Sequence, residues 1–159
     1  LGGHGGFGPE LGHTVVTGGT RECYCGRRGC LEAELDLNTL AHALELSEPS
    51  AAAIVAALDL DTSRESPVLV NQVDSLADAL TVFVGVFNPE VIMLGGVLGA
   101  MYDALPQRVD DAIRVSSFSP VAEMLRVRRA TLGADGVLIG AAETVFDAVL
   151  EDPMGSALQ

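Results

Sequence analysis

The chain contains no tryptophan and no lysine, and only 4% of its 159 residues are aromatic. All nine cationic side chains are arginines, and against 22 acidic ones they give a formal net charge of −13. So acidic a surface repels phosphate backbones, which excludes DNA binding by this segment unless a separate basic module makes the contact. Acidic surfaces are also common on soluble proteins without a special partner, and this simpler interpretation carries most of the weight.

The sequence also shows no pattern typical of a membrane-spanning segment or of a secretion signal. We expect no apolar run long enough to cross a bilayer, and the first residues lack the charged and apolar regions of a signal peptide. This predicts a cytoplasmic protein without membrane contact, a setting in which thiols stay reduced. A hydrophobic content of 48% and a mean hydropathy of +0.36 allow one globular domain with a sizeable core.

Cysteine is scarce, but the three cysteines lie together. Cys23, Cys25 and Cys30 follow His13 inside one eighteen-residue window. Three thiolates and one neutral imidazole saturate a tetrahedral zinc ion and leave no position for a reacting water. Glycines inside the loop let the backbone turn tightly enough for both of its sides to face one ion. The window therefore predicts a structural zinc site in a loop that spans residues 13–30.

Two simpler interpretations of the cysteines remain open, namely ordinary buried thiols and a disulfide with one cysteine left over. Cysteines one residue apart, such as Cys23 and Cys25, are poorly placed to bridge each other. An odd number of cysteines without a signal-like start also argues against a secreted disulfide framework. Both points favour zinc.

For His42 we expect a surface or packing role, because no second ligand lies near it in sequence.

Helical and strand patterns alternate along the chain and predict an α/β layered fold. Short β-branched or continuously apolar runs predict strands at 13–17, 90–94 and 124–130. Apolar residues at helical spacing predict helices at 37–44 with Asn38 as a cap, 51–58, 73–87, 102–113 and 136–149. The 73–87 helix, stopped at Asn88-Pro89, is expected to be central, and the strand at 90–94 to be covered on both faces.

A glycine pair, Gly95-Gly96, directly follows the second predicted strand. Glycines there could let the phosphates of a nucleotide approach the backbone, or they could only form a tight turn from strand to helix. No lysine and no longer glycine pattern accompanies the pair. We therefore favour the tight turn.

Three segments together resemble the ROK family, which comprises repressors, open reading frames and sugar kinases. They are the block from Glu10 to Glu32, Asn88-Pro-Glu-Val-Ile-Met-Leu-Gly-Gly96, and Leu132-Gly-Ala-Asp-Gly-Val-Leu-Ile-Gly-Ala-Ala142. The resemblance covers nearly the whole chain, and the cysteine block is highly specific. It implies an actin-like, hexokinase-type (ribonuclease H-like) α/β lobe that is the carboxyl-terminal half of a two-lobed protein.

On this resemblance, residues 1–159 form a single ROK carboxyl-terminal lobe with the zinc-binding loop at 13–30. The catalytic aspartate and phosphate loop of ROK kinases, and the winged helix-turn-helix domain of ROK repressors, would lie outside this chain, so we expect no catalytic residue in it. The glycine- and proline-rich opening is typical of a loop, which fits a chain entered midway. Gly8-Pro9 departs from the small residue and glycine that usually precede the glutamate in the family.

The same resemblance implies zinc binding by the four ligands above and contacts to sugar hydroxyls by Glu10, His13 and Glu32. Carboxylates accept hydrogen bonds from hydroxyls, and a histidine that binds a metal through one nitrogen can offer the other to a sugar. Taken alone, the two glutamates would be interpreted as capping or solvated carboxylates.

Two function classes follow from the resemblance. In a transcriptional regulator, a sugar effector bound between the lobes shifts DNA affinity through a domain outside this chain. In an ATP-dependent sugar kinase, the same pocket positions a hydroxyl for attack on ATP. The segments Val97–Met101, Arg114–Pro120 and Ala148–Pro153 look more like the regulator branch, which we favour, in a homo-oligomer. A zinc-stabilised fragment without sugar affinity is the third possibility.

Overall fold

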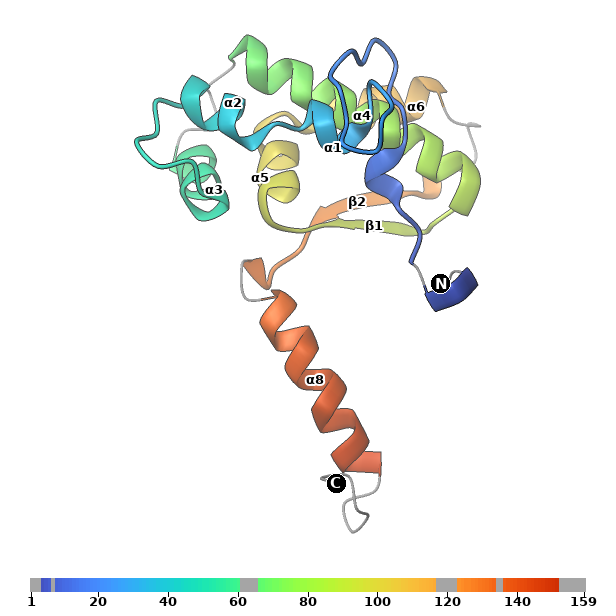
Figure 1. The fold of residues 1–159 in the computed structure, drawn as a ribbon. Helices are drawn as coiled ribbons and strands as arrows, with labels where there is room; N and C mark the ends of the chain where they lie inside the picture. The colour runs from blue at the N-terminus through green and yellow to red at the C-terminus, as the bar shows by residue number, and fades with distance from the viewer. Residues whose placement is uncertain (1–3, 7, 61–65, 117–122, 134–135, 152–159) are drawn as a thin grey trace.

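Helices cover one face of a two-stranded parallel sheet, and the last helix extends away from this body (Figure 1). The computed structural model describes the chain apart from residues 1–3, 7, 61–65, 117–122, 134–135 and 152–159. The elements in chain order are the 3₁₀ turns His4–Gly6 and Leu11–His13, α1 (Leu31–Glu34), α2 (Leu37–Ala43), α3 (Ala51–Leu60), α4 (Pro67–Phe87), β1 (Val91–Leu94), α5 (Gly96–Ala104), α6 (Pro106–Ser116), β2 (Arg126–Arg129) and α8 (Gly136–Glu151).

Helix α4 is the central helix, as the sequence predicted, but it begins six residues earlier than expected. Ser66 caps it by accepting a hydrogen bond from the Leu69 N–H (3.1 Å), and Pro67 occupies the first turn, where its missing N–H costs nothing. Asn88 ends the helix in a left-handed conformation at φ 44°. Its buried side chains are Leu69, Gln72, Val73, Leu76, Ala77, Ala79, Leu80 and Val84.

The length of α4 corrects one expectation. By length and composition, this helix could cross a membrane, whereas the sequence pattern predicted no such segment. The core helix of a globular protein passes the same test, and 44% of the most apolar window of α4 is buried inside the structure. Its buried residues pack with α2, α3, α5 and α6 in one continuous core.

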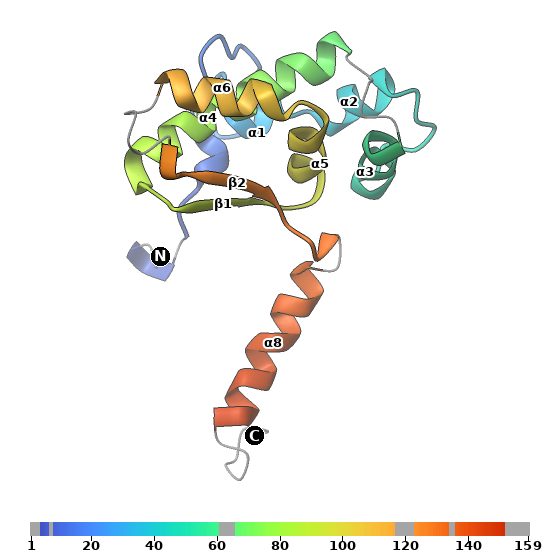
Figure 2. The same cartoon turned by 180° about the vertical axis from the view of Figure 1, so that it is seen from behind.

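The sheet pairs β1 with β2 in parallel, with Val91 opposite Arg126 and Leu94 opposite Arg129. Leu94 and Val127 belong to the core beneath the helices. Side chains alternate between the two faces of a strand, and in the described residues helices cover one face only (Figure 2). Met93 is accordingly 58% exposed. The expectation that this strand is covered on both faces is therefore wrong for the described part of the chain.

The helix predicted at 102–113 is in fact two helices. α5 ends at Ala104 and α6 begins at Pro106, because the residue before a proline is pushed out of the helical region. Leu105 accordingly has φ −138° and ψ 56°. The last predicted helix is present as α8, and its apolar Leu138 and Phe146 are exposed.

The N-cap of α2 also differs from the prediction, since Asp36 and not Asn38 caps the helix. The Asp36 carboxylate accepts hydrogen bonds from the N–H groups of Asn38 (2.9 Å) and Thr39 (3.2 Å). It also accepts from the Thr39 hydroxyl and from the Arg21 guanidinium, so it joins the cysteine loop to α2. Hydrogen bonds from Thr39, and then from Arg21, lower the pKa of this carboxyl to about 2.

Replacing Asp36 by alanine should destabilise the protein by about 1 to 2 kcal/mol through the lost cap and ion pair. Because the folded pKa lies below the ordinary value of 3.8, this contribution is complete above that value and is lost as the pH falls toward 2. Urea denaturation of both proteins from pH 6 to pH 2 measures the difference. A difference that does not narrow in acid would contradict the role of the ionised carboxylate.

Candidate metal centre

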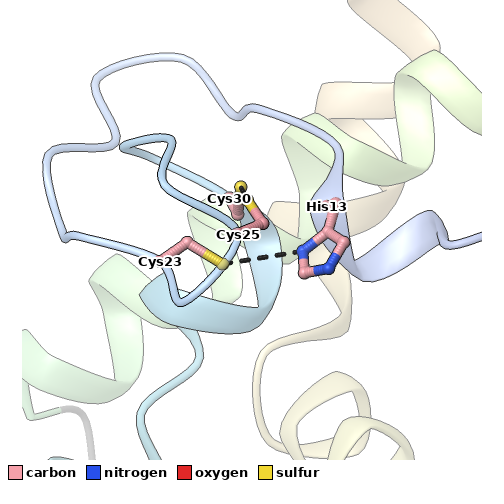
Figure 3. Close-up of side chains that lie close together, drawn as sticks. All are labelled: His13, Cys23, Cys25 and Cys30. Atoms are coloured by element: carbon pink, nitrogen blue, oxygen red, sulfur yellow. Dashed lines mark hydrogen bonds between the residues drawn. The ribbon is translucent and has the colours of Figure 1, made fainter.

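One histidine and three cysteines converge as the sequence predicted. The ligand atoms of His13, Cys23, Cys25 and Cys30 all lie within 4.8 Å of one another (Figure 3). The Cys23 Sγ lies 3.5 Å from the His13 Nδ1, and the Cys25 Sγ lies 3.6 Å from the Cys30 Sγ. A tetrahedral metal with ordinary bond lengths requires sulfur–sulfur edges of about 3.8 Å and sulfur–nitrogen edges of about 3.5 Å. The cluster could therefore hold a metal ion with a closed coordination shell.

The segment that carries His13 is not the strand predicted at 13–17. Leu11–His13 forms a 3₁₀ turn, and Val15 makes only an isolated antiparallel bridge with Cys30. The Leu31 N–H donates to the Thr14 carbonyl (2.8 Å) beside this bridge. The β-branched run is short, and it pairs with one residue of the chain and not with a second strand. The bridge nevertheless brings the start and the end of the loop together.

A tight turn arranges the first two cysteines. The Cys23 N–H donates to the Arg27 carbonyl (2.8 Å), and the Gly26 N–H donates to the Cys23 carbonyl (2.9 Å). Gly26 and Gly29 have φ values of 86° and 77°, which side chains with a Cβ rarely adopt. The role expected of these glycines in turning the loop is confirmed.

The loop is anchored on the central helix by apolar and polar contacts. Val16 and Leu31 pack with Ala79 of α4 in a small second core cluster. Thr17 donates from its N–H (2.7 Å) and from its hydroxyl (3.1 Å) to the Asp78 carboxylate. The cluster is therefore fixed to α4 and does not depend on the cysteines alone for its position.

The three thiols differ in exposure and acidity. Hydrogen bonds from the backbone and then the side chain of Arg27 lower the pKa of Cys25 to about 6, and this cysteine is exposed. Burial raises the pKa of Cys30 to about 11. A metal binds thiolates, so metal binding would displace the proton that Cys30 holds at neutral pH.

The two predicted sugar-binding glutamates flank the His13 turn. Glu32 lies in α1 with its Oε2 3.8 Å from the His13 Nδ1, and its side chain is 51% exposed. Glu10 directly precedes the turn, is exposed, and makes no capping hydrogen bond with its side chain. The capping interpretation therefore fails for Glu10. Tyr24, which the sequence did not single out, packs edge-on against the His13 ring at 5.0 Å between centroids.

Further positioning residues escaped the sequence analysis. Glu34 accepts hydrogen bonds from the N–H groups of Thr20 (2.6 Å) and Arg21 (2.8 Å). Asp78 lies 61 residues from the threonine that it holds, so no local pattern marks it. His42 is exposed and lies outside the cluster, as expected.

A cavity of about 730 Å³ lies at the glycine pair. Gly95 caps α5 and Gly96 begins it, so the pair forms the tight turn that the sequence favoured. Arg129 lines the cavity and donates to both carboxylate oxygens of Asp59 (2.6 and 3.0 Å) and to Asp103 (3.2 Å). Apolar side chains of α3 form much of the remaining wall.

Comparisons with known proteins agree with this architecture. The profile of the ROK family matches residues 1–148. The chain is 26% identical over 145 residues to the DNA-binding transcriptional repressor Mlc of Escherichia coli (strain K12), an alignment that covers 84% of this chain and 36% of Mlc. It is 28% identical over 162 aligned positions to a glucokinase of Thermotoga maritima, which covers 87% of this chain and 51% of the glucokinase.

Among solved structures, the ROK hexokinase from Thermus thermophilus matches with a TM-score of 0.64 and 26% identity over 94% of this chain and 52% of the hexokinase. The chain therefore spans about half of these kinases and about a third of the repressor. The predicted α/β lobe of the actin-like, hexokinase type is confirmed. The chain belongs to the ROK family.

Proposed function

We propose that this chain is the sugar-recognising, zinc-stabilised portion of a ROK transcriptional regulator. Residues 1–159 form one carboxyl-terminal lobe, which binds a small carbohydrate effector. DNA is contacted only through a domain outside this chain, since a net charge of −13 opposes contact with phosphates. The protein is cytoplasmic, makes no membrane contact and acts as a homo-oligomer.

The proposal depends most on the cluster of His13 with the three cysteines. Three sulfur donors and one nitrogen, all within 4.8 Å of one another, select zinc over magnesium or calcium, which prefer oxygen. When bound, zinc supplies a rigid structural link and no open coordination position. Its imidazole ligand uses Nδ1, the nitrogen near Cys23. The Nε2 of His13 is then available to a sugar hydroxyl.

The two glutamates complete the recognition site in this proposal. Glu32 is half exposed beside His13, and Glu10 is exposed at the start of the same turn. Among the described residues, no hydrogen-bond donor engages the carboxylate of Glu10 or Glu32, which leaves the oxygens of both for hydroxyl groups. Exposed carboxylates around a fixed imidazole suit a polyhydroxylated ligand.

The charge of the cavity at the glycine pair supports the regulator over the kinase. Phosphoryl transfer depends on electrostatic stabilisation of phosphate oxygens. Arg129 is the one cation among the described residues of the cavity wall, and its guanidinium is engaged by Asp59 and Asp103. No lysine exists in the chain to replace it.

A ROK sugar kinase is the alternative, and the same cavity is the observation in its favour. Its wall is largely apolar, its volume is about 730 Å³, and glycines line its rim, which would suit a nucleobase and its sugar. The chain is 28% identical to the Thermotoga maritima glucokinase and 26% identical to the repressor, so identity does not separate the two functions.

Replacing Glu32 or Glu10 by glutamine in the intact protein should weaken sugar binding by about 1 to 3 kcal/mol, because a charged hydrogen-bond acceptor is lost. The matched control is Glu48→Gln, an exposed glutamate outside the cluster. Isothermal titration with a panel of monosaccharides measures the affinities. Unchanged affinity in either variant would remove that glutamate from the site.

The function itself is tested on the intact protein with two assays. A regulator changes its affinity for operator DNA when sugar is added, and it does not transfer phosphate from ATP to glucose. Rapid ATP-dependent phosphorylation of a sugar would favour the kinase instead. A folded, zinc-containing protein that binds no sugar in either assay would contradict sugar recognition altogether.

A further inference from the structure

We propose that Cys25 and Cys30 form a disulfide when the protein meets a peroxide, and that this bond expels the metal and frees His13. The proposal rests on the zinc site proposed above. It adds a reversible modification site at two of the four ligands. Disulfides in reducing compartments are usually transient and redox-sensing, which is the class of device described here.

The geometry singles out this pair of sulfurs. The Cys25 Sγ and the Cys30 Sγ are 3.6 Å apart, so a bond of ordinary length requires an approach of about 1.5 Å. Cys23 instead lies nearest to His13, and it is separated from Cys25 by one residue, a spacing that disfavours a bridge. An added Cβ at Gly26 would meet no atom within 4 Å, so the turn beside Cys25 is not packed on that side.

The two sulfurs also differ in access. Cys25 is exposed, whereas Cys30 is fully buried. A peroxide therefore reaches Cys25 first, and the buried Cys30 lies next to it as the resolving thiol.

The chemistry balances with hydrogen peroxide as the oxidant. The sulfur of Cys25 attacks the O–O bond, which gives a sulfenic acid and hydroxide. The sulfur of Cys30 then attacks the sulfenic sulfur, forms the S–S bond and releases a second hydroxide. Two protons convert both hydroxides to water, and the two thiolates together lose the two electrons that the peroxide gains. A dithiol reductant reverses the bond by exchange.

The consequence for the site follows from the loss of two donors. His13 and Cys23 alone do not complete a closed tetrahedral shell, so the ion is released. The contacts of Val16 and Leu31 with Ala79 hold the loop on α4 without the metal. Oxidation therefore loosens His13 without unfolding the core, which couples sugar recognition to the redox state.

The test uses the intact, zinc-loaded protein and one equivalent of hydrogen peroxide. A colorimetric chelator follows zinc release, and non-reducing tryptic mapping locates the bond. Cleavage at Arg21, Arg27, Arg28 and Arg64 places Cys25 in peptide 22–27 and Cys30 in peptide 29–64. We expect one disulfide between these peptides, assigned to Cys25 by fragmentation, for each zinc released, with recovery by dithiothreitol and zinc.

Two histidine variants separate the proposed pair from simple loss of a ligand. Cys25→His keeps four metal ligands but removes the disulfide, and it should release zinc at least about tenfold more slowly than the wild type. Cys23→His also exchanges one ligand for histidine but keeps Cys25 and Cys30, and it should release zinc at least about tenfold faster than Cys25→His. Equal release from both variants would overturn the proposal.

Two further outcomes are informative in the wild type alone. A bridge between Cys23 and either partner, or sulfinic acid in place of a disulfide, would also overturn the proposal. A starting protein without zinc would contradict the proposed function, whereas the peptide map would still decide whether Cys25 pairs with Cys30.

Discussion

Replacing Cys30 by alanine is expected to reduce bound zinc from about one ion per chain to near zero and to cost about 3 kcal/mol or more of stability. Cys30 has no exposed surface, forms a backbone bridge with Val15 across the loop and is the N-cap residue of α1. Its loss removes a metal ligand and leaves a small cavity at the centre of the cluster. Elemental analysis and denaturant unfolding measure the two effects.

The control for this experiment is His42→Ala. His42 is exposed on α2 and lies outside the cluster, so zinc content and stability should stay close to those of the wild type. A Cys30→Ala protein that keeps one zinc per chain with unchanged stability would contradict the assignment of Cys30 as a ligand.

Gly29→Ala should destabilise the loop far more than Gly26→Ala. Both glycines have a left-handed φ, so each alanine costs about 1 to 2 kcal/mol of backbone strain. At Gly29 an added Cβ would also lie 2.7 Å from the carbonyl oxygen of Gly19, whereas at Gly26 nothing lies within 4 Å. We expect a loss of about 3 kcal/mol or more at Gly29, with weaker zinc binding, because the backbone must separate.

Thermal unfolding measures the stability of the two glycine variants, and competition with a zinc chelator measures their affinity for zinc. Since the two variants share the same strain, their difference reports the close contact between the Gly19 and Gly29 backbones. Equal losses would show that this contact does not hold the loop closed.

The clustering of the four candidate ligands was predictable from sequence because these residues are close along the chain and chemically distinctive. The spacing of His13 and the three cysteines limited the cluster to one loop, and the structure brings their ligand atoms within 4.8 Å. The long apolar stripe of α4 was equally clear, because a repeat over many turns outweighs local exceptions.

Features that depend on distant partners were not predictable in this way. The run from His13 to Thr17 has β-branched residues, but a strand needs a partner, and only Val15 finds one. The contact of Thr17 with Asp78 joins segments 61 residues apart. The break before Pro106, in contrast, is signalled by the proline itself, although the apolar spacing continues across it.

The exposed face of β1 was also not predictable from the apolar residues of the strand. A continuous apolar run is typical of a strand that is covered on both faces, yet Met93 is 58% exposed. Sequence patterns report which side chains suit burial and do not identify the element that covers them.

The proposed role of zinc, held by His13 and the three cysteines, is to fix the imidazole and the adjacent glutamates for a carbohydrate. Its most direct test is the affinity of the intact protein for its sugar, measured by calorimetry before zinc removal, after removal and after zinc is restored. We predict that affinity falls at least about tenfold without zinc and returns with it, which corresponds to about 1.4 kcal/mol. Equal affinity in the zinc-loaded and zinc-free protein would contradict the account.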